Sequence, residues 1–312
     1  MQLYQFLSKE LSASKQEIND FARSAPKKYK VYTIPKRTSG KRVIAHPARK
    51  LKEYQRTVVK YLDPLLSIHS TAFAYRKNIG IKQNAEQHKK SRYLLKMDFQ
   101  NFFHSITPKI LFSTLKELNL GLTENEEKLL TKILFWSPSK GAKDTLILSI
   151  GAPSSPLISN AIMFFFDQAI YKVCIKQKIT YTRYADDITF STNSKNSLFD
   201  IPTLVKNLLF EYFNGAITIN ESKTTFSSMS HNRHVTGVTL TNKRGISIGR
   251  QRKRYISSLI HKFSLNQIPE EDIKYLQGLF AFACNIEPVF KQRMIKKYST
   301  EIINQIITGS EK

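Results

Sequence analysis

Two adjacent aspartates between runs that favour β-strands constrain the fold of this chain more than any other feature. Residues 181–191 read Tyr-Thr-Arg-Tyr-Ala-Asp-Asp-Ile-Thr-Phe-Ser. Aromatic and β-branched residues on both sides predict a β-hairpin whose turn carries Asp186 and Asp187. Folding alone gains little from paired like charges, and a divalent cation would remove their repulsion. Mg²⁺ takes oxygen ligands and is commonly held by one or two carboxylates together with substrate phosphates.

The excess of basic residues indicates a polyanionic partner. The 312 residues include 49 Lys and Arg against 24 Asp and Glu, which gives a formal net charge of +25. This two-to-one excess goes well beyond what solubility requires. The basic residues gather, with aromatic residues among them, in the segments 27–52, 76–96, 243–254 and 291–297. Such interleaving is expected of a nucleic-acid channel.

The remaining composition favours a globular protein of the cytoplasm. Hydrophobic residues make up 41% of the chain, so a sizeable core can form. The sequence has no apolar run of the length of a transmembrane helix and no signal-peptide pattern at its N-terminus. Cys174 and Cys284 lie far apart without metal-ligand spacing, which predicts two reduced thiols. We therefore expect a cytoplasmic protein without a membrane partner.

Hydrophobic periodicity predicts that helices and strands alternate along the chain. The N-terminal half is expected to contain short helices within 1–24, a strand–turn–strand over 29–46 around Thr38-Ser39-Gly40, a helix over 51–68, a strand ending at Asp98, and helices over 107–118 and 124–135. The second half is expected to contain one long helix from Ser155 to about Lys176, the hairpin, a helix over 202–213, strands in 216–219 and 234–248, and helices from Arg250 onward. This order predicts an α+β fold.

Asp98 is the second candidate metal ligand. It ends the strand-like run Tyr93–Asp98 and precedes Asp186 by 88 positions, so the two carboxylates can meet only through the fold. An aspartate at this place can also simply stop a strand. The residues that follow, Phe99-Gln-Asn-Phe-Phe103, place a bulky side chain five positions after the aspartate, and this arrangement resembles the first catalytic motif of reverse transcriptases.

These two acidic segments resemble the catalytic motifs of reverse transcriptases. The resemblance implies a right-hand polymerase fold, with fingers, a palm whose antiparallel sheet carries the catalytic aspartates, and a helical thumb. It implies that Asp98 and Asp186 bind two Mg²⁺ ions and that Asp187 assists them. It also places Phe103 beneath the incoming sugar, where its ring would exclude a 2′-hydroxyl.

Three further segments resemble nucleotide-binding motifs of the same family. Lys41-Arg42 is similar to the fingers segment that grips the triphosphate, and Lys223 to the palm lysine that approaches the leaving pyrophosphate. Gly151-Ala152 opens a segment similar to the one that holds the templating base, although Ile150 stands where many members have Gln. The residues assigned to nucleotide binding are Lys41, Arg42, Phe99, Phe103, Gly151, Ala152 and Lys223.

Two short segments resemble signatures of the retron reverse transcriptases. Asn84-Ala-Glu-Gln-His88 matches Asn-Ala-x-x-His, and Val235-Thr236-Gly237 matches Val-Thr-Gly. In this family a small polymerase recognises a structured RNA, starts from the 2′-hydroxyl of a guanosine and makes branched, RNA-linked DNA. The implied partners are a cognate non-coding RNA and its RNA–DNA product, deoxynucleoside triphosphates, and effector proteins of anti-phage defence. The residues assigned to RNA binding are Asn84, His88, Val235, Thr236, Gly237, Arg250, Arg252 and Arg254.

The resemblance implies a division of the chain into three parts, and two other functions are alternatives. Residues 1–92 are expected to form the N-terminal helices and part of the fingers, 93–240 the palm with an inserted fingers segment, and 241–312 the palm end and helical thumb. One alternative is another compact bacterial reverse transcriptase, of a group II intron or a diversity-generating element. About 60 residues after Arg252 leave little room for the extra segments of an intron protein. The other is an RNA-binding scaffold with a vestigial polymerase site, against which the intact aspartates argue.

Overall fold

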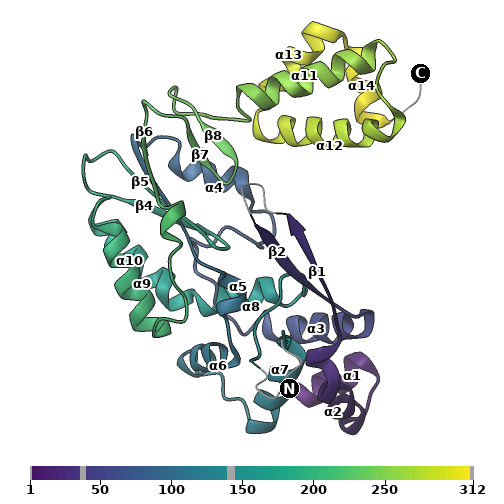
Figure 1. Cartoon of the computed structure of the whole chain (residues 1–312), viewed down its shortest axis with the longest axis vertical. Helices are drawn as coiled ribbons and strands as arrows, with labels where there is room; N and C mark the ends of the chain where they lie inside the picture. Colours follow the sequence, from purple (N-terminus) through teal and green to yellow (C-terminus); the bar gives the residue numbers. More distant parts are fainter. Residues whose placement is uncertain (1, 36–39, 139–144, 310–312) are drawn as a thin grey trace. The chain divides into compact units, whose positions relative to one another are not determined.

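The chain divides into two compact units, each assembled from separate stretches of sequence. The computed structural model describes residues 2–35, 40–138 and 145–309. Unit 1 comprises Met1–Tyr75, Met97–Ile188 and Phe199–Thr224, and unit 2 comprises Arg76–Lys96, Thr189–Leu198 and Thr225–Lys312. Figure 1 shows the elements in the colours of the sequence. The division into fingers, palm and thumb given above stays a prediction.

Unit 1 begins with helices and a β-hairpin. Helices α1 (Leu3–Leu11) and α2 (Lys15–Ser24) and a short 3₁₀ turn (Ala25–Lys27) precede strands β1 (Tyr29–Pro35) and β2 (Lys41–Pro47), which pair antiparallel, and helix α3 (Arg49–Leu62) follows. A capping box between Ser14 and Glu17 starts α2. Leu3, Leu7 and Val58 are fully buried where α1 packs on α3. Of the predicted turn at Thr38-Ser39-Gly40, residues 38 and 39 lie outside the described residues.

The remaining helices of unit 1 include two where the sequence pattern predicts a single long one. They are α5 (Phe102–Ser105), α6 (Pro108–Glu117), α7 (Glu124–Leu134), α8 (Ser155–Ile162), α9 (Phe164–Lys176) and α10 (Ile201–Phe213), with a 3₁₀ turn at Glu221–Lys223. The single helix predicted over 155–176 is wrong, because Met163 (φ −86°, ψ 1°) ends α8 and the chain bends by 48° into α9. No single helix within the described ranges is long and apolar enough to span a membrane, although this bent pair meets the same length and composition criteria together.

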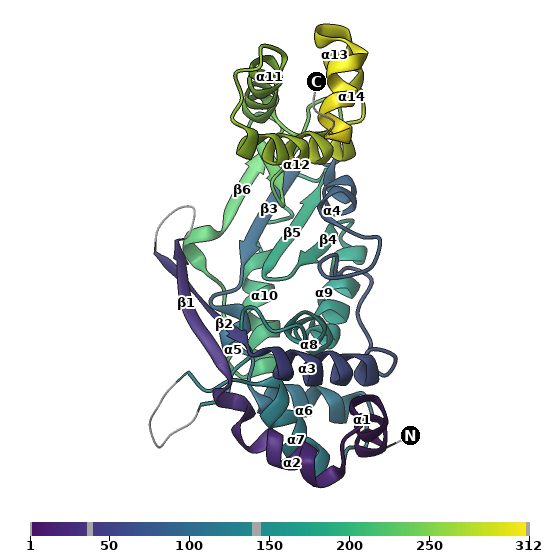
Figure 2. The same ribbon diagram turned by 90° about the vertical axis from the view of Figure 1, so that its right-hand side faces the viewer.

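A four-stranded sheet carries the acidic hairpin. Its strands are β3 (Tyr93–Asp98), β4 (Thr180–Tyr184), β5 (Asp187–Thr192) and β6 (Thr225–Ser228), in the order β4-β5-β3-β6. Strand β6 lies beside β3 and pairs antiparallel with it (Figure 2). In this pairing Tyr93 is opposite Ser228. The strand predicted over 216–219 is reduced to an isolated bridge between Phe99 and Ile219. The α+β class and the hairpin at 181–191 are confirmed.

Unit 2 packs a small sheet and a helix against four C-terminal helices. Its elements are α4 (Ile81–His88), β7 (Arg233–Val235), β8 (Val238–Leu240), β9 (Ile246–Ser247), α11 (Arg250–Ser264), α12 (Glu270–Ile286), α13 (Val289–Tyr298) and α14 (Thr300–Thr308). Strands β7, β8 and β9 form an antiparallel meander. One apolar cluster joins Val235 and Val238 of the hairpin to Leu276 and Phe280 of α12 and Ile303 of α14. This burial fixes the β7–β8 hairpin within unit 2.

Candidate active site

The acidic turn is tight and holds one residue in a strained conformation. Strand β4 ends at Tyr184 and β5 begins at Asp187, so Ala185 and Asp186 make the turn. Ala185 has φ 57°, a left-handed conformation that costs a residue with a Cβ about 1–2 kcal/mol. The backbone N–H of Phe99 donates to the carbonyl oxygen of Asp186 at 3.0 Å. This bond joins the turn to the residue that follows Asp98.

The carboxylates of Asp98 and Asp186 lie close enough to repel each other. Asp98 is 6% exposed, and its negative charge adds to burial in raising the pKa of Asp186 above its ordinary value, with burial the larger cause. The Lys223 ammonium donates to both carboxylate oxygens of Asp98 at 2.8 Å. The backbone N–H of Asn220 donates to the Asp98 carbonyl oxygen at 2.7 Å, which places the turn that carries Lys223.

This donor set fits a divalent cation. Two hard oxygen donors face one another, and a lysine ammonium bound to Asp98 stands where a positive charge is favoured. Among the described residues no group of three or more His, Cys, Asp and Glu side chains converges. The protein would therefore supply two carboxylates, and substrate phosphates and water would complete the coordination of each ion.

A polar cavity of about 390 Å³ joins the aspartates to most of the predicted nucleotide-binding residues. Its lining includes, of the predicted set, Lys41, Arg42, Asp98, Phe99, Phe103, Asp186 and Lys223. Asp187 is exposed in β5 and does not line this cavity. Tyr75 also lines it, and no sequence pattern identifies it, because it comes from a loop without a recognisable motif. Asn220 lines it too and begins the segment Asn220-Glu-Ser-Lys223 that resembles the palm motif, although the resemblance assigns a role only to its lysine.

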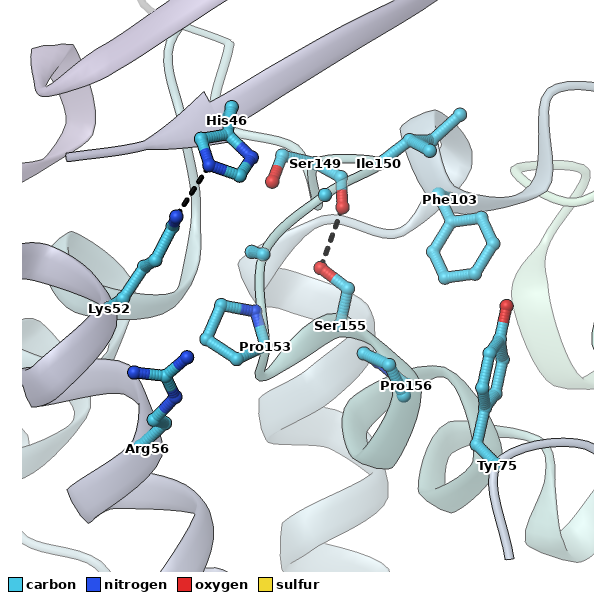
Figure 3. A pocket seen from close by; sticks show the side chains of 12 residues that line it. His46, Lys52, Arg56, Tyr75, Phe103, Ser149, Ile150, Pro153, Ser155 and Pro156 are labelled. Carbon is cyan, nitrogen blue, oxygen red and sulfur yellow. Dashed lines mark hydrogen bonds between the residues drawn. The ribbon is translucent and has the colours of Figure 1, made fainter. Parts of the chain in front are cut away.

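A second cavity of about 360 Å³ shares Tyr75, Phe103 and Ile150 with the first. Figure 3 shows it: Pro153, Pro156 and the aromatic side chains form apolar walls, and His46, Lys52 and Arg56 lie at one side. The Nζ of Lys52 lies 2.5 Å from Nε2 of His46. The predicted residues Gly151 and Ala152 line this cavity.

The local structure explains why glycine stands at position 151. Its φ is +120°, and a Cβ there would stand 3.3 Å from the carbonyl oxygen of Ala45 in β2. The backbone N–H of Ala45 donates to the carbonyl oxygen of Ile150 at 3.1 Å, so β2 lies directly against this loop. The hydroxyl of Ser155 donates to the Ser149 carbonyl oxygen at 2.7 Å and closes the loop (Figure 3). Glycine thus permits this φ without strain and a close approach that a side chain would make tighter than most such contacts.

The predicted RNA-binding residues gather in unit 2, but several are enclosed. Asn84 is 1% exposed, and its amide donates to the Thr236 hydroxyl at 3.4 Å. His88 is fully buried, lies 2.8 Å from the Ser191 hydroxyl through Nδ1, and has its pKa lowered to about 3 by burial. Val235 is also fully buried. These three side chains therefore serve packing and hydrogen bonding inside unit 2.

The other members of the predicted set lie nearer the surface. Thr236 and Gly237, with φ of 46° and 80°, make the two-residue turn between β7 and β8. Arg252 donates to the Gly237 carbonyl oxygen at 3.3 Å, so the start of α11 lies beside this turn. Arg250 and Arg254 are exposed. Direct RNA contact stays a prediction for the turn and for these arginines.

The chain matches a known family model and several relatives. Residues 34–240 match the model described as reverse transcriptase (RNA-dependent DNA polymerase). The chain is 47% identical over 283 residues to the Retron Ec83 reverse transcriptase of Escherichia coli, covering 91% of each chain. It is 31% identical over 314 residues to the Retron Ec73 reverse transcriptase of Escherichia coli, covering 97% of this chain and 96% of the relative.

Solved structures share the fold at low sequence identity. One is a telomerase from Candida tropicalis in complex with the TWJ fragment of telomeric RNA, with a TM-score of 0.53, 12% identity and 95% of this chain covered. Another is a telomerase from Candida albicans in complex with the same kind of fragment, with a TM-score of 0.51, 13% identity and 97% covered. The chain spans 58% and 59% of the length of these telomerase chains. Together with the family model, they confirm the predicted right-hand polymerase fold.

Proposed function

Because this chain belongs to the retron reverse transcriptases and is an RNA-directed DNA polymerase, we propose that it copies part of a cognate structured RNA into DNA that stays linked to that RNA. The observation that carries the catalytic part is the convergence of Asp98, Asp186 and Lys223 on one polar cavity with Lys41 and Arg42. As a reverse transcriptase the protein uses divalent metal ions. We propose that they are two Mg²⁺ ions.

The side chains around the polar cavity have distinct roles in this proposal. Asp98 and Asp186 would hold the ions, and Asp187 would assist from the start of β5. When bound, the ions would activate the primer hydroxyl and stabilise the charge on the triphosphate. Lys41 and Arg42 neutralise the triphosphate from β2. Lys223 is ion-paired to Asp98 in this structure and would bind the leaving pyrophosphate during the reaction.

The aromatic side chains of the cavity select the sugar in this proposal. Phe99 is 1% exposed and forms a rigid floor, with its ring centroid 5.3 Å from that of Phe102. Phe103 is half-buried and lines both cavities, with its ring centroid 6.5 Å from that of Tyr75. A ring at this place fills the space that a 2′-hydroxyl would need. The cavity therefore suits deoxynucleoside triphosphates.

The partner in this proposal is a structured non-coding RNA that also supplies the primer. The net charge of +25 supports a polyanionic partner, and the Thr236-Gly237 turn with the nearby arginines offers it a recognition surface. Priming from a guanosine 2′-hydroxyl, companion effector proteins, anti-phage defence and a cytoplasmic location are further parts of the proposal. Their support is the 47% identity to a retron enzyme over 91% of both chains. That identity also favours the retron type over intron-type or diversity-generating enzymes.

The chemical linkage of the product tests this proposal. The protein is incubated with RNA transcribed from the DNA beside its gene, Mg²⁺ and labelled deoxynucleotides, without an added primer. We expect labelled DNA whose gel mobility increases after treatment with an enzyme that cleaves 2′,5′-phosphodiester bonds. Product that is free of RNA from the start, or synthesis that needs an added DNA primer, contradicts RNA-linked priming. The Asp98→Asn variant is the matched control for contaminating polymerase.

A further inference from the structure

A charged pair without solvent contact lies in the interior of unit 1. Arg183 of β4 and Asp167 of α9 have side chains that are both 0% exposed. The guanidinium donates from Nε to Oδ1 at 2.9 Å and from Nη2 to Oδ2 at 2.7 Å, and the Tyr181 hydroxyl donates to Oδ1 at 2.7 Å. Hydrophobic side chains of similar volume would often hold such elements together at least as well, because they avoid the desolvation of two charges. The pair therefore indicates a role beyond packing.

One arm of the Arg183 guanidinium reaches the catalytic turn. Its Nη1 donates to the carbonyl oxygen of Ala185 at 3.2 Å and to Oδ1 of Asn160 at 3.2 Å. Ala185 is the left-handed residue of the turn, and Asp186 follows it directly. A strained backbone conformation persists only where its surroundings over-determine it. This hydrogen bond holds the peptide group that joins Ala185 to the metal-binding aspartate.

The same network reaches the wall shared by the two cavities. Asn160 of α8 donates from Nδ2 to the carbonyl oxygen of Ala74 at 2.9 Å. The next residue, Tyr75, is also left-handed, with φ 60°, and lines both cavities. The backbone of Arg183 pairs with the same loop, accepting from Phe73 N–H and donating to the Thr71 carbonyl oxygen, each at 2.8 Å. One buried network thus ends at the carbonyl groups beside both strained residues of the site.

We propose that Arg183 and Asn160 are positioning residues for DNA synthesis. Arg183 orients the Ala185–Asp186 peptide and so the Asp186 carboxylate, Asn160 orients the Tyr75 wall, and Asp167 fixes the guanidinium that connects them. None of these side chains lines either cavity. The proposal rests on the proposed metal site, since it describes how one carboxylate of that site is held. Groups that orient metal ligands typically change metal affinity or activity by about 10–100-fold when they are removed.

The Arg183→Lys variant tests the first part. A lysine keeps the charge opposite Asp167 but has no second arm for Ala185. We expect the Mg²⁺ concentration that half-saturates primer extension to rise about tenfold. Mn²⁺ binding to the protein without nucleotide, followed by electron paramagnetic resonance, should weaken by a similar factor. The KM for deoxynucleotides should stay within about twofold of wild type, because the Tyr75 wall is still held by Asn160.

Asn160→Ala tests the role of Asn160, and here the KM for deoxynucleotides should change more than the half-saturating Mg²⁺ concentration. This variant removes the donor to Ala74 and frees the Tyr75 segment, so the KM for deoxynucleotides should rise about tenfold. The half-saturating Mg²⁺ concentration should change less than in Arg183→Lys. An unchanged KM overturns the role assigned to Asn160.

A double variant separates positioning from folding. Arg183→Met with Asp167→Leu replaces the ion pair by apolar side chains, and the protein should unfold within a few degrees of the wild-type temperature. It should still show the weaker Mn²⁺ binding, because nothing then donates to Ala185. Ile170→Ala is the control, since it removes a buried side chain of α9 that carries no polar group. Wild-type Mn²⁺ binding in a folded double variant, or an equal loss in Ile170→Ala, overturns the proposal.

The variants Asp186→Asn and Arg183→Lys separate the metal-site assignment from the positioning role of Arg183. If Asp186→Asn extends primers normally, the site assignment is wrong and the positioning roles lose their basis. If Asp186→Asn is inactive while Arg183→Lys binds Mn²⁺ like wild type, the site stands and only the role of Arg183 is wrong.

Discussion

At the residue scale, the candidate site brings two carboxylates and one ammonium group close together. Asp98 is nearly enclosed and is held by Lys223, and Asp186 has a raised pKa beside it. Burial of both carboxylates without a positive charge would be unfavourable. Lys223 therefore acts as the counter-ion of Asp98 in this structure, and its contact with substrate phosphate stays a proposal.

Phe103 supports a prediction about sugar selection. The Phe103→Ala variant should incorporate ribonucleotides more readily, since it opens the space beneath the sugar, and the preference for deoxynucleotides should fall roughly tenfold or more. The loss of stability should be smaller than the about 3–5 kcal/mol of a fully buried phenylalanine, because the ring is only half-buried. Competitive incorporation of the two nucleotides measures the preference. Phe210→Ala, which removes an exposed ring of α10, is the control. An unchanged preference in folded Phe103→Ala would refute the proposal that the Phe103 ring excludes the 2′-hydroxyl.

Several residues predicted from sequence motifs lie together in the structure, and their catalytic roles stay predictions. Asp98, Asp186, Phe103 and Lys223 lie at motif positions and line one cavity, as expected. Tyr75 and the Arg183 network could not be predicted, because their places depend on left-handed backbone and on contacts between distant segments. A buried ion pair leaves no periodic pattern in the sequence.

At the scale of elements, strand and loop approach each other where glycine allows it. Gly151 lies against β2, the strand that also carries Lys41 and Arg42. The hydrophobic periodicity over 155–176 predicts helix but does not reveal the bend at Met163, because both helices bury apolar side chains. Periodicity reports which face is buried and not whether the axis continues.

Two glycine substitutions provide a matched prediction at this scale. Gly237→Ala should cost about 1–2 kcal/mol, because φ is +80° and nothing lies within 4 Å of the new Cβ. Gly151→Ala should cost more and should raise the KM for deoxynucleotides, since its Cβ would press on the backbone of β2. Thermal unfolding and extension kinetics measure the two effects. Equal destabilisation by the two variants, or a larger KM change in Gly237→Ala, contradicts this account of Gly151.

At the scale of the whole molecule, the chain crosses between its two units several times. Unit 2 takes Arg76–Lys96 and Thr189–Leu198 from the middle of the sequence in addition to the C-terminal part. The predicted boundaries at 92 and 240 describe fingers, palm and thumb and stay a prediction beside this division into compact units. The motifs and their order along the chain predicted the family and the fold class. Which separate stretches of sequence pack into the same unit could be seen only in the structure.

The net charge supports a prediction about RNA binding. Replacing Arg250, Arg252 and Arg254 with Ala should weaken binding to the cognate RNA and flatten its dependence on salt by about one unit of slope per lost phosphate contact. Extension of a generic annealed primer at saturating protein should remain. The control replaces Lys109, Lys116 and Lys132, exposed residues of α6 and α7, and removes the same charge elsewhere. Equal weakening by both triple variants means that the arginines act only through net charge.

The most direct test of the central claim is single-turnover incorporation by Asp186→Asn. A template–primer of RNA and DNA is bound at saturation, and one labelled deoxynucleotide is added with Mg²⁺. We predict that the rate falls by about a thousandfold or more, with unchanged thermal unfolding and template–primer affinity, because the carboxylate serves the reaction rather than the fold. Asp98→Asn should behave alike, and Asp187→Asn should lose less. Incorporation by folded Asp186→Asn within about tenfold of the wild-type rate would contradict a polymerase site built on Asp98 and Asp186.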